Sequence, residues 1–393
     1  MPATVVLGTA RTPFGKLGGA LSTLDATDLG AKAVEAALER AEVAPDEVEG
    51  LAFGQVLQAG QGQIPSRQVQ VKAGIPQEVP SETVNKVCAS GLRSAGIIDQ
   101  AIRLGELEVA VAGGMESMSK APYLLPDARF GFRMGDVKAL DAMTHDGLTN
   151  PFTGKQMAPE ANEVADELEL TRADLDRYAL RSHQLAVQAT DEGRLPEEIV
   201  AVEVASKKEQ KTVEVDEGPR PDASLESLSK LKPIVEDGTH TAGNSPGLND
   251  GAGALVLASD EWARRNDRRP LATIRGQAAA AGEFRALAPT PAKATRLLLE
   301  KAGVSIDDVD LFEINEAFAS VAVNTMRELG IQEDRMNVNG GAIALGHPIG
   351  ASGARIIGSL IHELRRRGGG LGVAAICSGG GQGDAVLVEV DGG

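Results

Sequence analysis

The feature that most constrains the fold of this 393-residue chain is an internal repeat. The segment LERAEVAPDEVEGLAFGQV, which starts at Leu38, aligns over its whole length with LEKAGVSIDDVDLFEINEA, which starts at Leu299, at a separation of 261 residues (299 − 38). Further along, Val84-Asn85 and Val338-Asn339 each precede a helical pattern, with a longer intervening loop in the second case. Duplication of one α/β unit explains both matches, so we expect two halves of similar topology.

Short apolar runs alternate with helical periodicity through both halves, which is typical of parallel βα units. The pattern predicts strands at residues 5–9, 51–56, 109–112, 311–314, 371–376 and 385–390, and helices at 29–41, 91–104, 292–302, 316–329 and 352–367. The predicted fold class is therefore α/β.

A segment of different character lies between the halves, from about Ser117 to Ser245, and carries proline, methionine and scattered charges. Its Arg172–Thr190 part has apolar residues at helical spacing, which is too regular for a disordered tether. We interpret the segment as an inserted loop domain. The predicted domains are an N-terminal half (residues 1–116 and 246–270), the loop domain (117–245) and a C-terminal half (271–393).

The composition argues against several functions. A formal net charge of -17 would repel a polyanionic duplex, so we expect no nucleic-acid partner. The start MPATVVLGTARTPFGK has no leader pattern, and no apolar run reaches the roughly 18 residues that a membrane span needs, which predicts a cytoplasmic protein without a membrane partner. Two cysteines are too few for a disulfide framework, so both thiols are expected to be free, and no metal site is predicted.

Cys88 lies between an extended run and the start of a predicted helix, in Asn-Lys-Val-Cys-Ala-Ser-Gly-Leu-Arg. At a helix start, unpaired backbone N–H groups and the positive end of the helix dipole favour the thiolate, which is the nucleophilic form. A small buried core residue is the alternative interpretation. Its position makes Cys88 a candidate nucleophile.

His347 stands in the glycine-rich segment that runs from Asn339 to Gly353. Pro348 disfavours helical geometry at the histidine, so the ring is expected to project from a loop. A phosphate-binding loop is a competing interpretation, but the glycine spacing fits neither GxGxxG nor GxxxxGK[ST]. A histidine that only caps a helix also stays open.

Two further motifs follow predicted strands. Cys377 begins Cys-Ser-Gly-Gly-Gly-Gln-Gly at a strand's C-terminal end, where open α/β sheets bind ligands and where glycine amides can approach an oxyanion. Asn315 begins Asn-Glu-Ala-Phe between a strand and a helix. A tight turn and a helix N-cap, respectively, are the structural alternatives. In a repeat, however, two matched sheets would bring Cys88, Asn315, His347 and Cys377 to one side.

With these residues in place, the sequence resembles the thiolase family along essentially its full length. The motifs that carry the resemblance are Asn85-Lys-Val-Cys-Ala-Ser-Gly-Leu-Arg, Asn315-Glu-Ala-Phe-Ala, Gly340-Gly-Ala-Ile-Ala-Leu-Gly-His-Pro-Ile-Gly, Cys377-Ser-Gly-Gly-Gly-Gln-Gly, Arg11-Thr-Pro-Phe-Gly and Gly243-Asn-Ser-Pro-Gly-Leu-Asn-Asp-Gly. The resemblance implies duplicated βαβαβαββ halves that form a five-layer αβαβα core, with the loop domain inserted.

The resemblance also implies a role for each residue. Cys88 would accept the acyl group, His347 would take the thiol proton, and Cys377 would be the acid/base thiol. Asn315 would hold a water that forms one oxyanion hole with His347, and the amides of Cys88 and Gly379 would form the other. The implied reaction is a ping-pong Claisen condensation of two acetyl-CoA molecules, or the reverse thiolysis of 3-ketoacyl-CoA.

Coenzyme A would be a substrate or product, with no permanently bound cofactor. The residues that match the family's CoA site are Leu148, Met157, Arg220, Ser227, Ala317 and Phe318. The chain departs from many short-chain biosynthetic members at Gln156-Met157-Ala158, where they have His-Met-Gly, and at Pro246, where they have serine. These departures leave the pantetheine contacts and the acyl chain length open.

Other functions are weighed against this one. A decarboxylating enzyme of the ketoacyl-synthase type would lack a second reactive cysteine, so Cys377 argues against it. A thiolase-like protein that binds acyl-CoA or lipid without turnover would have lost a catalytic residue, and none is lost. The resemblance further implies a homodimer or homotetramer, for which Met115–Met134 is a candidate assembly loop, and the physiological direction of the reaction stays open.

Overall fold

The computed structural model describes residues 2–205 and 210–392. Its strands are β1 (Thr4–Arg11), β2 (Gly15–Lys16), β3 (Gly50–Gly54), β4 (Ser81–Val84), β5 (Val109–Ser117), β6 (Tyr123–Leu124), β7 (Leu140–Asp141), β8 (Val202–Ala205), β9 (Gln210–Val213), β10 (Asn249–Ser259), β11 (Ala272–Ala281), β12 (Leu311–Ile314), β13 (Gly370–Ser378) and β14 (Gln382–Val390). Its α-helices are α1 (Ala26–Ala41), α2 (Pro65–Lys72), α3 (Ser90–Leu104), α4 (Met157–Glu167), α5 (Arg172–Asp191), α6 (Leu225–Ser229), α7 (Asp260–Arg265), α8 (Thr290–Ala302), α9 (Ala319–Leu329), α10 (Ala342–Leu345) and α11 (Ser352–Arg366).

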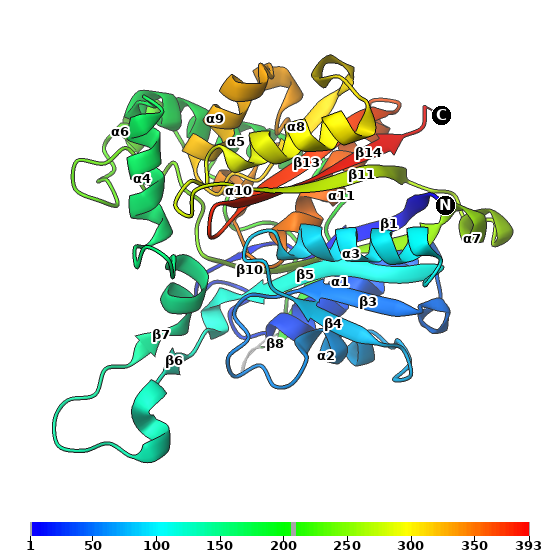
Figure 1. Cartoon of the computed structure of the whole chain (residues 1–393), viewed down its shortest axis with the longest axis horizontal. Helices are drawn as coiled ribbons and strands as arrows, with labels where there is room; N and C mark the ends of the chain where they lie inside the picture. The colour runs from blue at the N-terminus through cyan, green and yellow to red at the C-terminus, as the bar shows by residue number, and fades with distance from the viewer. Residues whose placement is uncertain (1, 206–209, 393) are drawn as a thin grey trace.

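The main sheet contains both halves of the repeat in the order β12-β13-β14-β11-β1-β10-β5-β3-β4. The halves meet where β1 pairs with β11 over three residues, Thr4–Val6 against Ala272–Ile274. The repeat led us to expect two separate sheets, but this short antiparallel contact makes one hydrogen-bonded path. Beyond the contact the two half-sheets lie one above the other (Figure 1).

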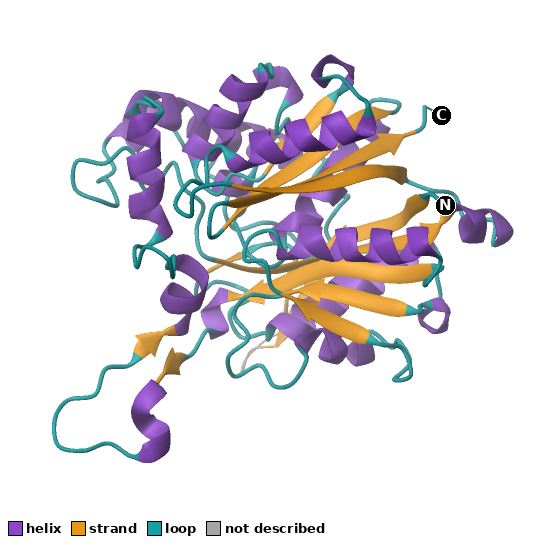
Figure 2. Cartoon of the chain, in the orientation of Figure 1, coloured by secondary structure: helices purple, strands orange, loops and turns teal. Residues whose placement is uncertain are grey.

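Five layers stack as predicted (Figures 1 and 2). Helices α1 and α2 cover the outer face of the first half-sheet, α3 and α11 pack together between the two half-sheets, and α8 covers the outer face of the second. Strands β1, β5 and β10 are buried at every position, because helices cover both faces of the sheet they belong to. Helices α3, α8 and α9 end at Gly105, Gly303 and Gly330, each in the left-handed conformation that glycine adopts without strain.

The repeat holds in three dimensions, with one local difference. The starts of β5 and β13 lie 261 residues apart (370 − 109), and those of α3 and α11 lie 262 apart (352 − 90). The turn Lys86–Cys88 matches the turn Val338–Gly340, because the first and last residues of each turn form an equivalent isolated β-bridge. The two turns lie 252 residues apart (340 − 88). Our match of Val84-Asn85 with Val338-Asn339 was therefore wrong by two residues. Between this turn and the long helix, the second half has ten more residues than the first (262 − 252). We call this segment, residues 341–351, the histidine loop.

The second half also lacks a full counterpart of β4. Only Met336 pairs in parallel with Phe312 of β12, as an isolated bridge. The connection between the last two strands differs most: three glycines, 379–381, join β13 to β14, whereas residues 118–248 join β5 to β10. This long connection contains α4, α5, α6 and the small hairpins, so we retain the division at residues 117 and 245 as a proposal.

The β6–β7 hairpin projects from the body of the molecule at the end opposite the two termini (Figure 1). Phe130 at its tip is 93% exposed, and Phe132 and Met134 are also exposed. Our assembly segment, Met115–Met134, began too early, because Met115 is a buried residue of β5. The exposed apolar loop is residues 123–141.

Candidate active site

A cleft of about 780 Å³, open to solvent on one side, lies beside the N-terminus of α3. Cys88 and His347 both line it, one from each half of the repeat. Its other lining residues are mainly apolar, and four of them, Leu148, Met157, Ala317 and Phe318, belong to the predicted CoA site. Gln156 and Pro246, the two departures from the short-chain pattern, also line the cleft.

The turn that carries Cys88 is held in an unusual backbone conformation. Val87 has φ +46°, a left-handed value that is strained for a β-branched residue. Side chains fix this conformation: Asn85 Oδ1 accepts from the Val87 N–H at 3.1 Å, and Ser90 Oγ accepts from the Lys86 N–H at 2.8 Å. The strain therefore resides directly before the candidate nucleophile, at the entrance to α3.

The proton on Cys88 is controlled by burial more than by the helix. Burial raises the pKa of the Cys88 thiol to about 12, and the nearby Glu116 adds to the shift, while a backbone hydrogen bond opposes it. The sequence led us to expect that the helix dipole would favour the thiolate. Burial opposes that effect, because the thiol is only 5% exposed and loses the hydration that a thiolate needs.

His347 is held as a neutral ring with a defined tautomer. Ser352 Oγ lies 3.0 Å from the Pro348 carbonyl oxygen, to which it donates its hydrogen, and 2.6 Å from His347 Nδ1. The hydroxyl therefore accepts from Nδ1–H, which leaves the lone pair on Nε2. Burial, aided by the charge of Arg355, lowers the pKa of His347 to about 3. The histidine can thus act as a base through Nε2.

Asn315 contacts the same imidazole from the end of β12. Its Nδ2 donates to His347 Nε2 at 3.4 Å, and its own backbone N–H donates to the Ala375 carbonyl at 2.9 Å. Its Oδ1 is buried and makes no hydrogen bond to the described part of the chain. This oxygen can accept a hydrogen bond from a molecule that enters the site.

Cys377 lies at the end of β13, fully buried behind the cleft. Burial raises its pKa well above the ordinary value, and the charge of Cys88 contributes to the shift. A Cβ added to Gly379 would meet Met157 Cε at 2.8 Å and Val87 Cγ2 at 3.2 Å. The glycine turn after Cys377 thus approaches the turn before Cys88.

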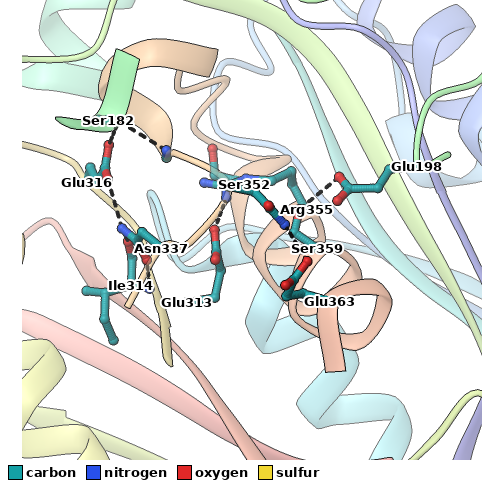
Figure 3. Close-up of polar contacts among 12 residues, drawn as sticks. Ser182, Glu198, Glu313, Ile314, Glu316, Asn337, Ser352, Arg355, Ser359 and Glu363 are labelled. Atoms are coloured by element: carbon teal, nitrogen blue, oxygen red, sulfur yellow. Dashed lines mark hydrogen bonds and ion pairs between the residues drawn. The ribbon is translucent and has the colours of Figure 1, made fainter. Parts of the chain in front are cut away.

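A buried carboxylate anchors the Asn315 side of the site (Figure 3). Glu316 accepts hydrogen bonds from Tyr178 (2.8 Å), Ser182 (2.8 Å) and Asn337 (2.9 Å), and from the Ile343 N–H of the histidine loop (3.0 Å). Four neutral donors satisfy one buried charge, which is costly to bury unless it is hydrogen-bonded. Glu316 thereby ties α5 of the inserted segment to the loop that bears His347.

A buried ion pair lies nearby (Figure 3). Arg355 Nη1 and Glu313 Oε1 are 2.5 Å apart, with side chains 0% and 7% exposed. Burial raises the pKa of Glu313 to about 8, although the arginine opposes the shift. The charge of Arg355 favours the neutral form of His347.

Glu116 holds the other side of the histidine loop. Its carboxylate accepts from the N–H groups of Val56 (3.1 Å), Leu57 (3.1 Å) and Gly350 (3.0 Å). Burial nevertheless raises its pKa to about 7. In the repeat, Glu116 of β5 corresponds to Cys377 of β13, because the two residues lie 261 positions apart (377 − 116), as the two strands do. The first half therefore has a structural carboxylate at this position, and the second half has a thiol.

Two predicted CoA-site residues lie outside the cleft that contains Cys88. Arg220 is exposed and lines a neighbouring hollow with Lys16, and its backbone N–H donates to His183 Nδ1 at 3.3 Å. Ser227 is also exposed, and its hydroxyl donates to the Ser224 carbonyl in the cap of α6. Their roles stay predictions.

Sequence reasoning missed the residues that position the predicted ones. Ser352 and Asn249 fix the histidine, since Asn249 Oδ1 accepts from the His347 N–H at 2.9 Å. Neither residue has a spacing that reveals the contact. Glu316 stood inside a quoted motif, and the repeat alignment would have drawn attention to Glu116.

In the described ranges, no group of three or more His, Cys, Asp or Glu side chains could hold a metal ion. Likewise, none of the helices formed by residues 2–205 and 210–392 is long and apolar enough to cross a membrane.

Comparison with known proteins places this site in a family. The chain matches the family descriptions “Thiolase, N-terminal domain” over residues 4–261 and “Thiolase, C-terminal domain” over residues 268–390. It is 45% identical to the acetyl-CoA acetyltransferase of Chromobacterium violaceum, covering 98% of each chain, and 46% identical to that of Rhizobium meliloti, covering 99% of each. The structure of human mitochondrial 3-ketoacyl-CoA thiolase is similar, with a TM-score of 0.96, 42% identity and 99% coverage of both chains. The chain therefore belongs to the thiolase family.

Proposed function

We propose that the protein is an acyl-CoA C-acyltransferase that condenses two acetyl-CoA molecules to acetoacetyl-CoA and catalyses the reverse thiolysis of 3-ketoacyl-CoA. The observation that carries the proposal is that Cys88 and His347 line one cleft and that Asn315 contacts His347. Cys377 belongs to one apolar cluster with the cleft residues Met157, Ala317 and Phe318. Relatives named acetyl-CoA acetyltransferase, at about 45% identity over the full chain, support the same activity.

The first half-reaction acylates Cys88. Nε2 of His347 takes the thiol proton while the sulfur attacks the thioester carbonyl carbon of acetyl-CoA, which forms a new carbon–sulfur bond. The bond to the CoA sulfur then breaks, and the departing thiolate takes the proton from His347. The amides of Cys88 and Gly379 are proposed to stabilise the oxyanion, a contribution of roughly 3–4 kcal/mol per donor.

The second half-reaction forms the carbon–carbon bond. After CoA leaves, Nε2 of His347 takes the proton of Cys377, and the resulting Cys377 thiolate takes an α-proton from a second acetyl-CoA. The protonated His347 and a water held by Asn315 donate hydrogen bonds to the enolate oxygen. The enolate carbon attacks the acyl carbonyl, the bond to the Cys88 sulfur breaks, and Cys88 recovers a proton from His347 while Cys377 keeps the α-proton. Because burial raises the pKa of Cys377, its thiolate is a stronger base than an ordinary cysteine thiolate.

We also propose that acyl-CoA and CoA bind along the cleft as substrates, with no permanently bound cofactor, and that Arg220 and Ser227 contact the distal part of CoA. The mainly apolar lining supports this for the pantetheine arm. The protein is proposed to form a homodimer or homotetramer in the cytoplasm, and the exposed apolar residues of loop 123–141 support assembly.

The test is mass spectrometry after incubation with acetyl-CoA, which should find one acetyl group on Cys88. Cys377→Ala should still become acetylated but should not release acetoacetyl-CoA. Unmodified Cys88 in the wild type would overturn the proposal. Release of carbon dioxide from malonyl-CoA would favour a decarboxylating synthase instead.

A further inference from the structure

Lys86 makes two contacts with the other half of the repeat. It stands two residues before Cys88, and its ammonium lies 2.5 Å from Asp384 Oδ1 on β14. Its backbone carbonyl accepts a hydrogen bond from Ser378 Oγ on β13. Lys86 therefore touches both strands of the hairpin that carries Cys377.

The contacts flank the second cysteine closely. Ser378 is its neighbour along β13, and Asp384 pairs with Ile376, one position from the pair formed by Cys377 and Gly383. In the first half, Lys86 and Cys88 form the isolated β-bridge of the turn in which Val87 is strained. Lys86 thus links the turn that carries Cys88 to the strand end that carries Cys377.

The ion pair is sheltered from solvent. The Lys86 and Asp384 side chains are 19% and 3% exposed, so the attraction is screened much less than at the surface. Burial raises the pKa of Asp384, while the charges of Lys86 and Arg93 oppose that shift.

We propose that Lys86, through Asp384 and Ser378, is a positioning residue that sets the separation of the Cys88 and Cys377 sulfurs. The proposal rests on the proposed function, because only the second half-reaction needs both thiols. Acylation needs Cys88 and His347, whereas condensation needs Cys377 to deliver an enolate to the acyl group on Cys88. Loss of the ion pair should therefore slow condensation selectively.

The experiment compares the two half-reactions in Lys86→Met/Asp384→Asn. Both charges are removed together, because Lys86→Met alone would leave a buried carboxylate unpaired and destabilise the fold. The acetylation rate of Cys88 should stay within about twofold of wild type, while kcat for condensation and for thiolysis should fall about tenfold or more, as misplacement of reacting groups does. Lys86→Arg should retain most of the wild-type rate.

Gln277→Met provides the matched control. Gln277 of β11 also joins the halves, donating to the Gly96 carbonyl (2.7 Å) and to Asp99 Oδ2 (2.9 Å) of α3, but it contacts neither cysteine strand end. It should affect neither half-reaction. Equal loss in both half-reactions of the double variant, or no loss in either, would overturn the proposal.

A second readout needs no turnover. A short bis-methanethiosulfonate reagent should bridge Cys88 and Cys377 in the wild type and Gln277→Met, with a several-fold lower yield in the double variant. An equal yield in all three proteins would count against the proposal. If Cys88 bridges but is never acetylated by acetyl-CoA, the proposed function fails while the positioning role stands.

Discussion

At the scale of single residues, the site is built around the location of one proton. Burial keeps the proton on Cys88, whose pKa is raised to about 12, and keeps His347 neutral, with a pKa of about 3. Ser352 orients the ring so that its basic nitrogen, Nε2, faces Asn315. In the proposed mechanism, the nucleophile is therefore generated only when the histidine takes the proton in the presence of the substrate.

This arrangement predicts a flat pH profile for acetylation of Cys88. The reactive pair, thiol plus neutral imidazole, keeps the same population between the two pKa values, so the rate should change less than about threefold from about pH 6 to about pH 9. The measurement is quenched-flow mass spectrometry, with glutathione as a free-thiol reference whose rate should rise with pH. A tenfold rise per pH unit in the enzyme would show attack by a preformed thiolate.

Ser352→Ala should lower kcat for the overall reaction about tenfold with little change in KM. The variant removes the hydroxyl that fixes the Nδ1–H tautomer, while the ring itself stays buried. Ser352→Thr, which keeps the hydroxyl, should recover most of the rate. Steady-state thiolysis assays distinguish these outcomes, and equal activity in all three proteins would contradict the assigned role.

The sequence could predict the candidate site residues but not their environment. Cys88, Asn315, His347 and Cys377 were found because each follows a strand or lies in a glycine loop of a repeat. Two effects on the Cys88 thiol oppose each other: burial disfavours the thiolate, and the helix start favours it. The sequence does not indicate which of the two effects is larger. Lys86 and Asp384 lie 298 residues apart, so their contact exists only in the fold.

At the scale of elements, α3 and α11 cross closely near Cys88 and His347, the proposed nucleophile and base. The two helices touch at their first turns, where Gly91 and Gly353 have no side chains. A Cβ on Gly353 would lie 2.1 Å from the Leu92 nitrogen, and one on Gly91 would lie 2.8 Å from the Gly350 carbonyl oxygen. Only glycine permits this approach.

Gly353→Ala should therefore lower the free energy of unfolding by about 1–3 kcal/mol or more, because backbone atoms must move apart. Activity should fall by more than the loss of stability explains. The reason is that α11, the displaced helix, directly follows the histidine loop, so its displacement also moves His347. Gly282→Ala is the matched control, because nothing lies within 4 Å of the added carbon. Urea unfolding measures both variants, and equal stability would show that the crossing is not tight.

Most helices and strands were predictable from periodicity, but their boundaries were not. The helix expected over residues 316–329 begins at Ala319, because Glu316 is bound to four donors. The short helix α10 within the histidine loop was not expected from a glycine-rich segment. The β1–β11 contact depends on sheet twist and packing, which local sequence patterns do not encode.

At the scale of the whole molecule, buried charges tie the inserted segment to the first half. Arg11 of β1 contacts Glu198 at 3.0 Å and Asp216 at 2.7 Å, and all three side chains are nearly inaccessible to solvent. The insert is thus fixed to the core by charges that are costly to separate.

Arg11→Met should destabilise the protein by about 3–5 kcal/mol, because two carboxylates would be left buried without a partner. Arg265→Met breaks an exposed pair with Glu108 and should change stability by less than about 1 kcal/mol. Thermal unfolding would check both variants, and a small effect of Arg11→Met would contradict the expectation.

Assembly should depend on loop 123–141. Phe130→Ser/Met134→Ser removes its exposed apolar tip and should shift the protein to a smaller species in light scattering on dilution. Phe284→Ser, which changes an exposed aromatic residue elsewhere, should leave the mass unchanged. An unchanged mass in the double variant would assign assembly to another surface.

The histidine loop has a consequence for the symmetry of the molecule. It is extra to the repeat, so a chain built from two copies of the first half would place two nucleophile turns opposite each other with no base between them. A chain built from two copies of the second half would present two bases and, since Gly340 replaces Cys88, no acyl acceptor. The proposed reaction thus depends on sequence divergence between the two copies. A consensus sequence designed from both copies would fold but would lack activity.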